Sequence, residues 1–197
     1  TLFLDFDVPK ESEYRAGNHT LNAWKRSMSD LLVRVQMVAD ALIDSGRSEH
    51  WRGSLSGHKG VHLFLDFPPI HPSNGNISQF KNGLKEFGEN LIDVLDEEAG
   101  GINIKPWVDV DSSDLARLVR HPNTPHPRAD HADGQKWAVP VTIEELASIT
   151  PEEYLELTDG PRALPGWSDR VPSEQSGRKI AMTVRNAAGG NISSASF

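Results

Sequence analysis

Two acidic residues stand at the end of an apolar segment near the start of the chain. Asp5 and Asp7 are separated by Phe6 and preceded by Phe3 and Leu4. If this segment is a strand, side chains two residues apart point to the same face, and carboxylate oxygens are the ligands that Mg2+ and Mn2+ prefer. Such a pair is more often a solvated strand edge, but charges in an apolar strand are costly without a partner. The pattern therefore indicates a candidate metal site.

A second candidate lies in residues 56–62, which read SGHKGVH. The two glycines permit a sharp turn whose backbone amides can meet an anion. Ser56, Lys59 and His62 would supply further donors to a polyphosphate. The segment is not a P-loop, because the Gly-x-x-x-x-Gly-Lys-Ser/Thr spacing is absent. A hairpin turn with incidental polar residues explains the local pattern equally well.

The third candidate runs from Asp109 to Arg128. An acid at the end of a predicted strand is followed by a predicted helix that carries Arg117 and Arg120, and then by a proline-bounded loop that contains His126. Taken alone, these residues are most simply an exposed basic helix and a solvated loop.

The same loop offers an alternative site for zinc. Three histidines recur every five residues with two aspartates beside them: His121, His126, His131, Asp130 and Asp133. The chain contains no cysteine, so thiolate ligands are not available to such a site. The absence of cysteine therefore counts against a zinc site in this loop.

Taken together and in this order, the three segments resemble the archaeo-eukaryotic primase superfamily, which includes primase small catalytic subunits and primase-polymerases. That family shows an apolar strand ending in Asp-x-Asp, then Ser-Gly-x-Lys/Arg-Gly-x-His. An Asp follows, and then Arg-x-x-Arg/Lys-x-Pro-x-Ser-x-His-x-Lys. The resemblance covers roughly residues 1–145. Thr124 stands where the family has serine, Arg128 stands where lysine is usual, and the cysteine-rich zinc element is missing. The chain thus looks more like a viral, plasmid or stand-alone primase-polymerase than a cellular small subunit.

The resemblance implies a role for each matching residue. Asp5, Asp7 and Asp109 would be catalytic and would bind two Mg2+ or Mn2+ ions. The residues that would bind the triphosphate of the incoming nucleotide are Ser56, Lys59, His62, Arg120 and His126, with Arg128 a weaker candidate.

The implied activity is that of a DNA primase or DNA-directed polymerase, which transfers nucleotides from NTPs or dNTPs in a template-directed reaction and makes primers for DNA replication. Its partners would be a single-stranded DNA template and primer, and an accessory helical primase domain or a helicase. A repair polymerase of the same superfamily, acting at breaks or lesions, shares the same motifs. A metal-dependent nuclease built on the same acids and an inert DNA-binding replisome module are further alternatives. A nuclease would not need the triphosphate-binding residues.

Hydrophobic periodicity predicts the elements that position these residues. Strands are expected over 1–7, 51–55, 61–67, 102–110 and 137–141, and helices over 20–45, 80–95, 112–119 and 143–148, with another helix opening at 150–153. Residues 121–135 are expected to be a loop. The fold class is α+β, a primase-core-like, RRM-like sheet that is largely antiparallel and flanked by helices.

The chain has 197 residues and a net charge of −8. We predict a catalytic domain over 1–158, with residues removed upstream because the chain opens within a strand, and a linker or weakly ordered extension over 159–197. The acidic balance argues against a protein that coats nucleic acid through a broad basic surface. No apolar run approaches the roughly 20 residues that a membrane helix needs, so we expect a cytoplasmic protein without a membrane partner.

Overall fold

The computed structural model describes residues 2–66, 77–109, 121–127 and 135–167. These residues form a sheet of six strands in the order β4-β1-β3-β2-β6-β5. Each pair of neighbouring strands is antiparallel. The strands are β1 (Leu2–Asp7), β2 (Trp51–Leu55), β3 (Gly60–Leu65), β4 (Val108–Asp109), β5 (Thr124–Pro125) and β6 (Trp137–Val141). The prediction of an α+β fold with an antiparallel sheet flanked by helices is confirmed.

The strand register divides the sheet into one apolar and one mixed face. On β1, Leu2, Leu4 and Phe6 lie opposite apolar residues of β3 and are at most 2% exposed. The alternate residues Phe3, Asp5 and Asp7 point to the other face because side chains alternate along a strand. The first and third motifs therefore begin on strands of this sheet and the second leads into one, and the apolar side of the sheet forms the core.

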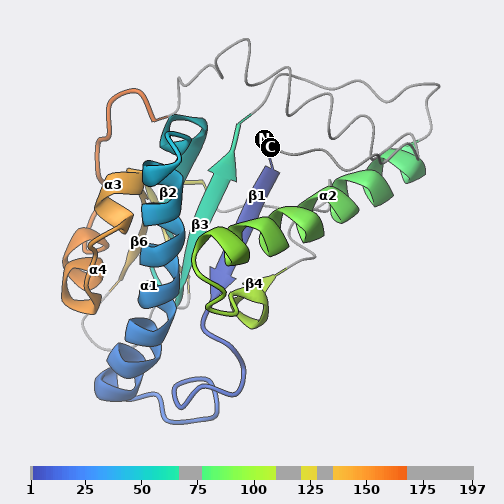
Figure 1. Ribbon diagram of the computed structural model, residues 1–197. Coiled ribbons are helices and arrows are strands. Elements are labelled where there is room, and N and C mark those ends of the chain that lie inside the picture. The colour runs from blue at the N-terminus through green and yellow to red at the C-terminus, as the bar shows by residue number, and fades with distance from the viewer. Residues whose placement is uncertain (1, 67–76, 110–120, 128–134, 168–197) are drawn as a thin grey trace.

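The two long helices, α1 (Leu21–Asp44) and α2 (Ile77–Glu98), cover the apolar face of the sheet (Figure 1). Thr20 caps α1 by accepting a hydrogen bond from the Ala23 amide. The buried side chains of α1 recur at three- and four-residue spacing, so one stripe of the helix faces the sheet. The two shorter helices, α3 (Ile143–Leu146) and α4 (Pro151–Leu157), each begin with a capping box and pack beside α1.

Two predicted elements within and just before the third motif differ from the structure. The strand expected over 102–110 is wrong for most of its length, because Lys105–Trp107 is a 3-10 turn and only Val108–Asp109 pairs with β1. Pro106 lacks an amide hydrogen and Asn103 has a φ of 59°, which explains why an extended strand does not form. Conversely, the expected loop at 121–135 contains β5, which pairs with β6. The helix expected over 112–119 lies outside the described residues.

The segment 160–167 packs on the domain, although the sequence predicted that a linker begins at 159. Arg162 forms an ion pair with Glu145 and donates its backbone amide to Asn123 at 2.7 Å. Trp167 donates its indole N–H to the Gly53 carbonyl at 2.7 Å. These contacts fix the first part of the predicted extension against β2 and α3; residues 168–197 lie outside the described residues.

Within the described parts of the chain, no helix combines the length and apolarity that crossing a bilayer requires.

Candidate functional site

Two of the predicted metal ligands and one predicted phosphate ligand form a single row across three strands. Asp5 on β1 is the direct cross-strand partner of His62 on β3 and of Asp109 on β4. His62 Nε2 lies 3.4 Å from Asp5 Oδ1, and the Asp5 side chain keeps a quarter of its surface exposed. Because the register places the three residues side by side, their side chains share the polar face of the sheet. We call Asp5, His62 and Asp109 the acid row.

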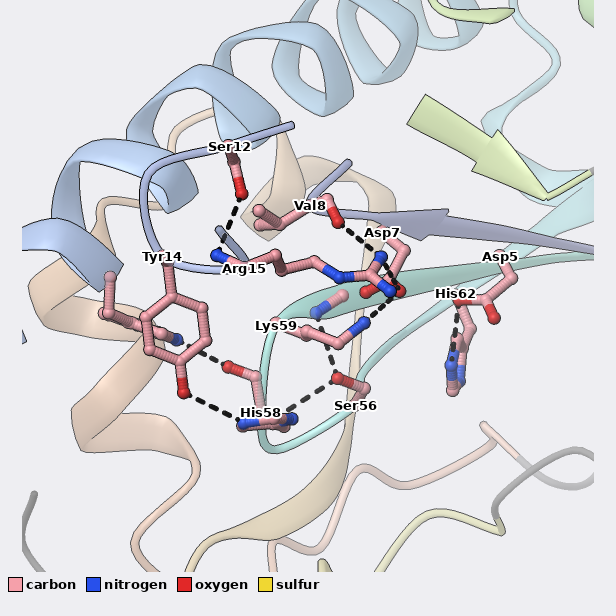
Figure 2. A network of polar contacts seen from close by, with 12 residues as sticks. Asp5, Asp7, Val8, Ser12, Tyr14, Arg15, Ser56, His58, Lys59 and His62 are labelled. Carbon is pink, nitrogen blue, oxygen red and sulfur yellow. Dashed lines mark hydrogen bonds and ion pairs between the residues drawn. The ribbon is translucent and has the colours of Figure 1, made fainter. Parts of the chain in front are cut away.

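Asp7 lies two residues beyond the acid row on the same face and is bound by two cations (Figure 2). Lys59 Nζ donates to Asp7 Oδ2. Arg15 Nη1 lies 3.4 Å from the same oxygen and also donates to the Val8 carbonyl at 2.8 Å. The Asp7 charge is thus neutralised within the protein, at the end of the site where the sequence predicted a triphosphate.

Ser56 is directed at the backbone of its own turn. Its hydroxyl oxygen accepts hydrogen bonds from the Gly60 amide at 3.1 Å and from the His58 amide at 3.3 Å. These two amides therefore close the turn in this structure, where the sequence suggested that turn amides would meet an anion. Ser56 is 9% exposed, so its placement favours a role in shaping the turn.

The backbone of the turn is held from the core side by two aromatic side chains. Trp24 of α1 donates its indole N–H to the His58 carbonyl at 2.7 Å, and Tyr154 of α4 donates its hydroxyl to the Gly60 carbonyl at 2.9 Å. Gly57 has a φ of +79°, and a Cβ atom there would lie 2.6 Å from the Trp137 backbone. The turn that carries Lys59 is therefore fixed by packing that does not involve the Lys59 side chain.

Tyr154 gives this packing a dependence on pH that can be measured. Burial raises the pKa of Tyr154 from its ordinary value of 10.0 to about 12. Below pH 10 the residue is protonated in both states; above it the unfolded state loses the proton first, so the free energy of unfolding falls between pH 10 and 12. By pH 11 we expect this loss to reach about 1 kcal/mol.

Denaturant unfolding of the wild type and of Tyr154→Phe at pH 8 and pH 11 tests this expectation. At pH 8 the variant should be less stable by about 1 kcal/mol, because the Gly60 carbonyl loses a donor. At pH 11 the difference should narrow, since phenylalanine does not titrate. Equal losses of stability in both proteins between the two pH values would contradict the prediction.

His126 lies beside the same turn. Its ring centroid is 4.9 Å from that of His58, and its backbone amide donates to the Lys136 carbonyl at 2.7 Å. His58 Nε2 in turn lies 3.1 Å from the Tyr14 hydroxyl. The ring of His58 therefore links two segments of the predicted phosphate site, residues 56–62 and the loop that contains His126.

Two predicted phosphate ligands, Arg120 and Arg128, lie outside the described residues, as do His131, Asp130 and Asp133 of the zinc alternative. His121 Nδ1 lies 2.7 Å from the Pro122 carbonyl oxygen. Among residues 2–66, 77–109, 121–127 and 135–167, no three histidine, aspartate or glutamate side chains are arranged to hold a metal ion. The zinc alternative therefore gains no support from the described part of its loop.

The acid row nevertheless fits a divalent metal ion by its donor chemistry. Asp5 and Asp109 present hard oxygen ligands from directly opposed positions, and like charges opposed across two strands destabilise a sheet. A cation between them would remove that repulsion. Asp7 would complete the set by exchanging Lys59 and Arg15 for the metal.

Several residues of the site were not found from the sequence. Arg15 lies in a loop without periodicity, and its contact with Asp7 depends on how residues 8–20 fold back. Tyr14 reaches His58 by the same loop. Trp24 lies in the helix predicted over 20–45, and Tyr154 follows the helix start predicted at 150–153. A buried tyrosine or tryptophan usually has a polar partner. That rule predicts a hydrogen-bond partner for each of these side chains, but it does not identify the carbonyl groups of residues 58 and 60 as those partners.

Comparisons of the chain with models of protein families, with curated proteins and with solved structures find no match.

Proposed function

We propose that this protein is a primase-polymerase that transfers nucleotides from NTPs or dNTPs to a growing strand on a DNA template, and that its sheet is the catalytic core of that enzyme class. The observation that carries the proposal is the acid row with Lys59 and Asp7 beside it. His62, Asp5 and Asp109 occupy adjacent strands in one register, and Lys59 contacts the next acid along β1. Acids and cations thus lie together on one face of the sheet, the combination of groups on which the proposed nucleotidyl transfer depends.

In the reaction, the oxygen of a primer 3′-hydroxyl, or of a first nucleotide's hydroxyl, attacks the α-phosphorus of the incoming nucleotide. The bond from that phosphorus to the bridging oxygen of the β-phosphate breaks, pyrophosphate leaves, and the hydroxyl proton passes to solvent. Asp5, Asp7 and Asp109 would hold two divalent ions, which supply stabilisation of the attacking and leaving oxygens when bound. Contact with the phosphates of the nucleotide falls to side chains of this protein.

Lys59 and Arg15 have a second task in this proposal. Both contact Asp7 Oδ2, so both lose that contact when Asp7 turns to another cation, while Arg15 stays hydrogen-bonded to the Val8 carbonyl. The released groups lie at the end of the site nearest the turn, where they can meet the β- and γ-phosphates. A fixed cation that meets developing charge on a leaving group lowers the barrier electrostatically. This pairing also favours a polymerase over a nuclease, which needs no cations for a triphosphate.

Incorporation of labelled nucleotides tests the proposal. The protein is incubated with Mg2+ or Mn2+ and either unprimed or primed single-stranded DNA, and products are resolved by length. Synthesis on the unprimed template supports a primase, and extension of a primer alone supports a polymerase of the repair type. Folded protein that incorporates nothing with either metal would reject the proposal and direct attention to nuclease activity or to an inert DNA-binding role.

A further inference from the structure

The polar face of the sheet also carries a group of aromatic and cationic side chains next to the acid row. Arg52 on β2, Phe64 on β3 and Phe3 on β1 are cross-strand partners in one row. This row lies two residues from the acid row, on the side away from Asp7. Trp167, from the segment that follows α4, packs over it. We call Phe3, Arg52, Phe64 and Trp167 the aromatic row.

Arg52 and Trp167 hold each other in a defined position. Arg52 forms a two-bonded ion pair with Asp66, and its guanidinium carbon lies 4.5 Å from the centroid of the Trp167 ring. Trp167 makes an edge contact with Phe64, with centroids 5.7 Å apart, and its indole N–H donates to the Gly53 carbonyl. An indole held by a guanidinium, a ring edge and a backbone carbonyl is a rigid planar surface.

Burial identifies Trp167 as the ring that a ligand can reach. Phe3 and Phe64 are 9% and 7% exposed, so they serve mainly as its support. Trp167 is partly exposed. A flat aromatic surface beside a cation is suited to stacking with a heteroaromatic ring, and every nucleobase offers such a face.

The rows form a straight path along β1 on which an extended nucleoside triphosphate could lie. Phe3, Asp5 and Asp7 mark three successive levels along β1: the aromatic row, the acid row, and the Lys59 and Arg15 cations. Four residues of a strand span about 13 Å at about 3.3 Å per residue. A nucleotide that lies along the strand with its phosphates at Lys59 would place its base at the aromatic row.

From these observations we infer that Trp167, supported by Arg52 and Phe64, is the stacking surface for the base of the incoming nucleotide. The inference rests on the proposed function and adds the direction in which the nucleotide lies. It also assigns a binding role to a segment that follows the last helix of the described fold. Because the contact is a stack, it binds all bases and leaves their selection to the template.

Two ligands that differ only by the nucleoside test this inference: dATP and inorganic tripolyphosphate, each measured by calorimetry with Mg2+. Trp167→Ala should bind dATP at least about fivefold more weakly, the lower bound for loss of one stacked base, and should bind tripolyphosphate as the wild type does. Trp167→Phe keeps a ring and should retain most of the dATP affinity. Lys59→Ala should weaken the binding of both ligands.

Trp107→Ala is the matched control. Trp107 is also partly buried and also has an arginine, Arg34, 4.1 Å from its ring centroid, but it packs on the helix-covered face. The Trp107→Ala variant should leave dATP binding unchanged. Thermal unfolding of each variant establishes that the proteins compared are folded.

The outcomes separate this inference from the proposed function. Equal dATP affinity in the wild type and Trp167→Ala overturns the stacking role while the catalytic proposal stands. If Trp167→Ala loses affinity only for a single-stranded oligonucleotide and not for dATP, the inference is also overturned, because the stacked base would then belong to the template. A wild type that binds neither dATP nor tripolyphosphate overturns both.

Discussion

Replacing Asp5 with asparagine should reduce nucleotide incorporation about a thousandfold, the upper end of what loss of one electrostatic stabiliser of a transition state costs. Asp5 lies between His62 and Asp109, so it is the one acid that touches both neighbours of the row. Asparagine has the same shape and can still accept a hydrogen bond from His62. The change therefore removes a charge while preserving the packing of β1.

The stability of the same variant should change little. Asp5 and Asp109 are like charges in directly opposed positions, and such pairs destabilise a sheet by a few tenths to about 1 kcal/mol. His62 Nε2 lies 3.4 Å from Asp5 Oδ1 and offsets part of that repulsion, so Asp5→Asn should unfold within about 1 kcal/mol of the wild type in denaturant without metal. Loss of activity together with little change in stability is typical of a residue retained for catalysis.

Asp93→Asn is the matched control for Asp5→Asn. Asp93 is an exposed acid of α2 that pairs with Lys105 at 2.7 Å, and exposed pairs of this kind contribute little to stability. This variant should incorporate nucleotides at the wild-type rate. Wild-type incorporation by Asp5→Asn would show that the acid row does not carry out the reaction.

Replacing Lys59 with alanine should lower kcat/KM for the nucleotide about a hundredfold, because one cation of the phosphate end is lost. Most of the effect should appear as weaker binding of nucleotide and of the product pyrophosphate. The fold should persist, since Trp24 and Tyr154 hold the turn through backbone carbonyl groups, and Arg15 still pairs with Asp7.

Lys59→Arg and Lys105→Ala complete that experiment. The arginine variant keeps the positive charge and should recover part of the pyrophosphate affinity, although its planar group differs from an ammonium in geometry. Lys105 is exposed and pairs with Asp93, so its removal should have no effect. Unchanged nucleotide and pyrophosphate affinity in Lys59→Ala would show that the Lys59–Asp7 pair is only structural.

Much of the fold could be predicted from local patterns in the sequence. The apolar alternation of β1 and the stripe of α1 each have a single period, and Thr20 and Thr142 cap helices within one or two residues of the expected starts. The region 102–110 could not be predicted in this way, because Ile102, Ile104 and Val108 suit a strand while Pro106 and the φ of Asn103 prevent it. Local preference and backbone geometry conflict there, and geometry determines the outcome.

The site was predictable only where its residues share a strand or a turn. Asp5 and Asp7 are neighbours by the two-residue period alone, and Lys59 belongs to the adjacent hairpin. The contact of Arg15 with Asp7 closes a loop of eight residues, and that of Trp167 with Arg52 joins residues 115 positions apart. They depend on how a loop and a segment without periodicity return to the sheet, which no local pattern specifies.

The support of the turn at residues 56–60 has a consequence for how this protein could change over time. Trp24 and Tyr154 contact carbonyl oxygens, groups that every amino acid possesses. The side chains at positions 58 and 59 can therefore be exchanged without altering the path of the chain. Substitutions at these two positions should preserve the fold even where, as at Lys59, they reduce activity, whereas few substitutions should be tolerated at Trp24, Gly57 or Tyr154.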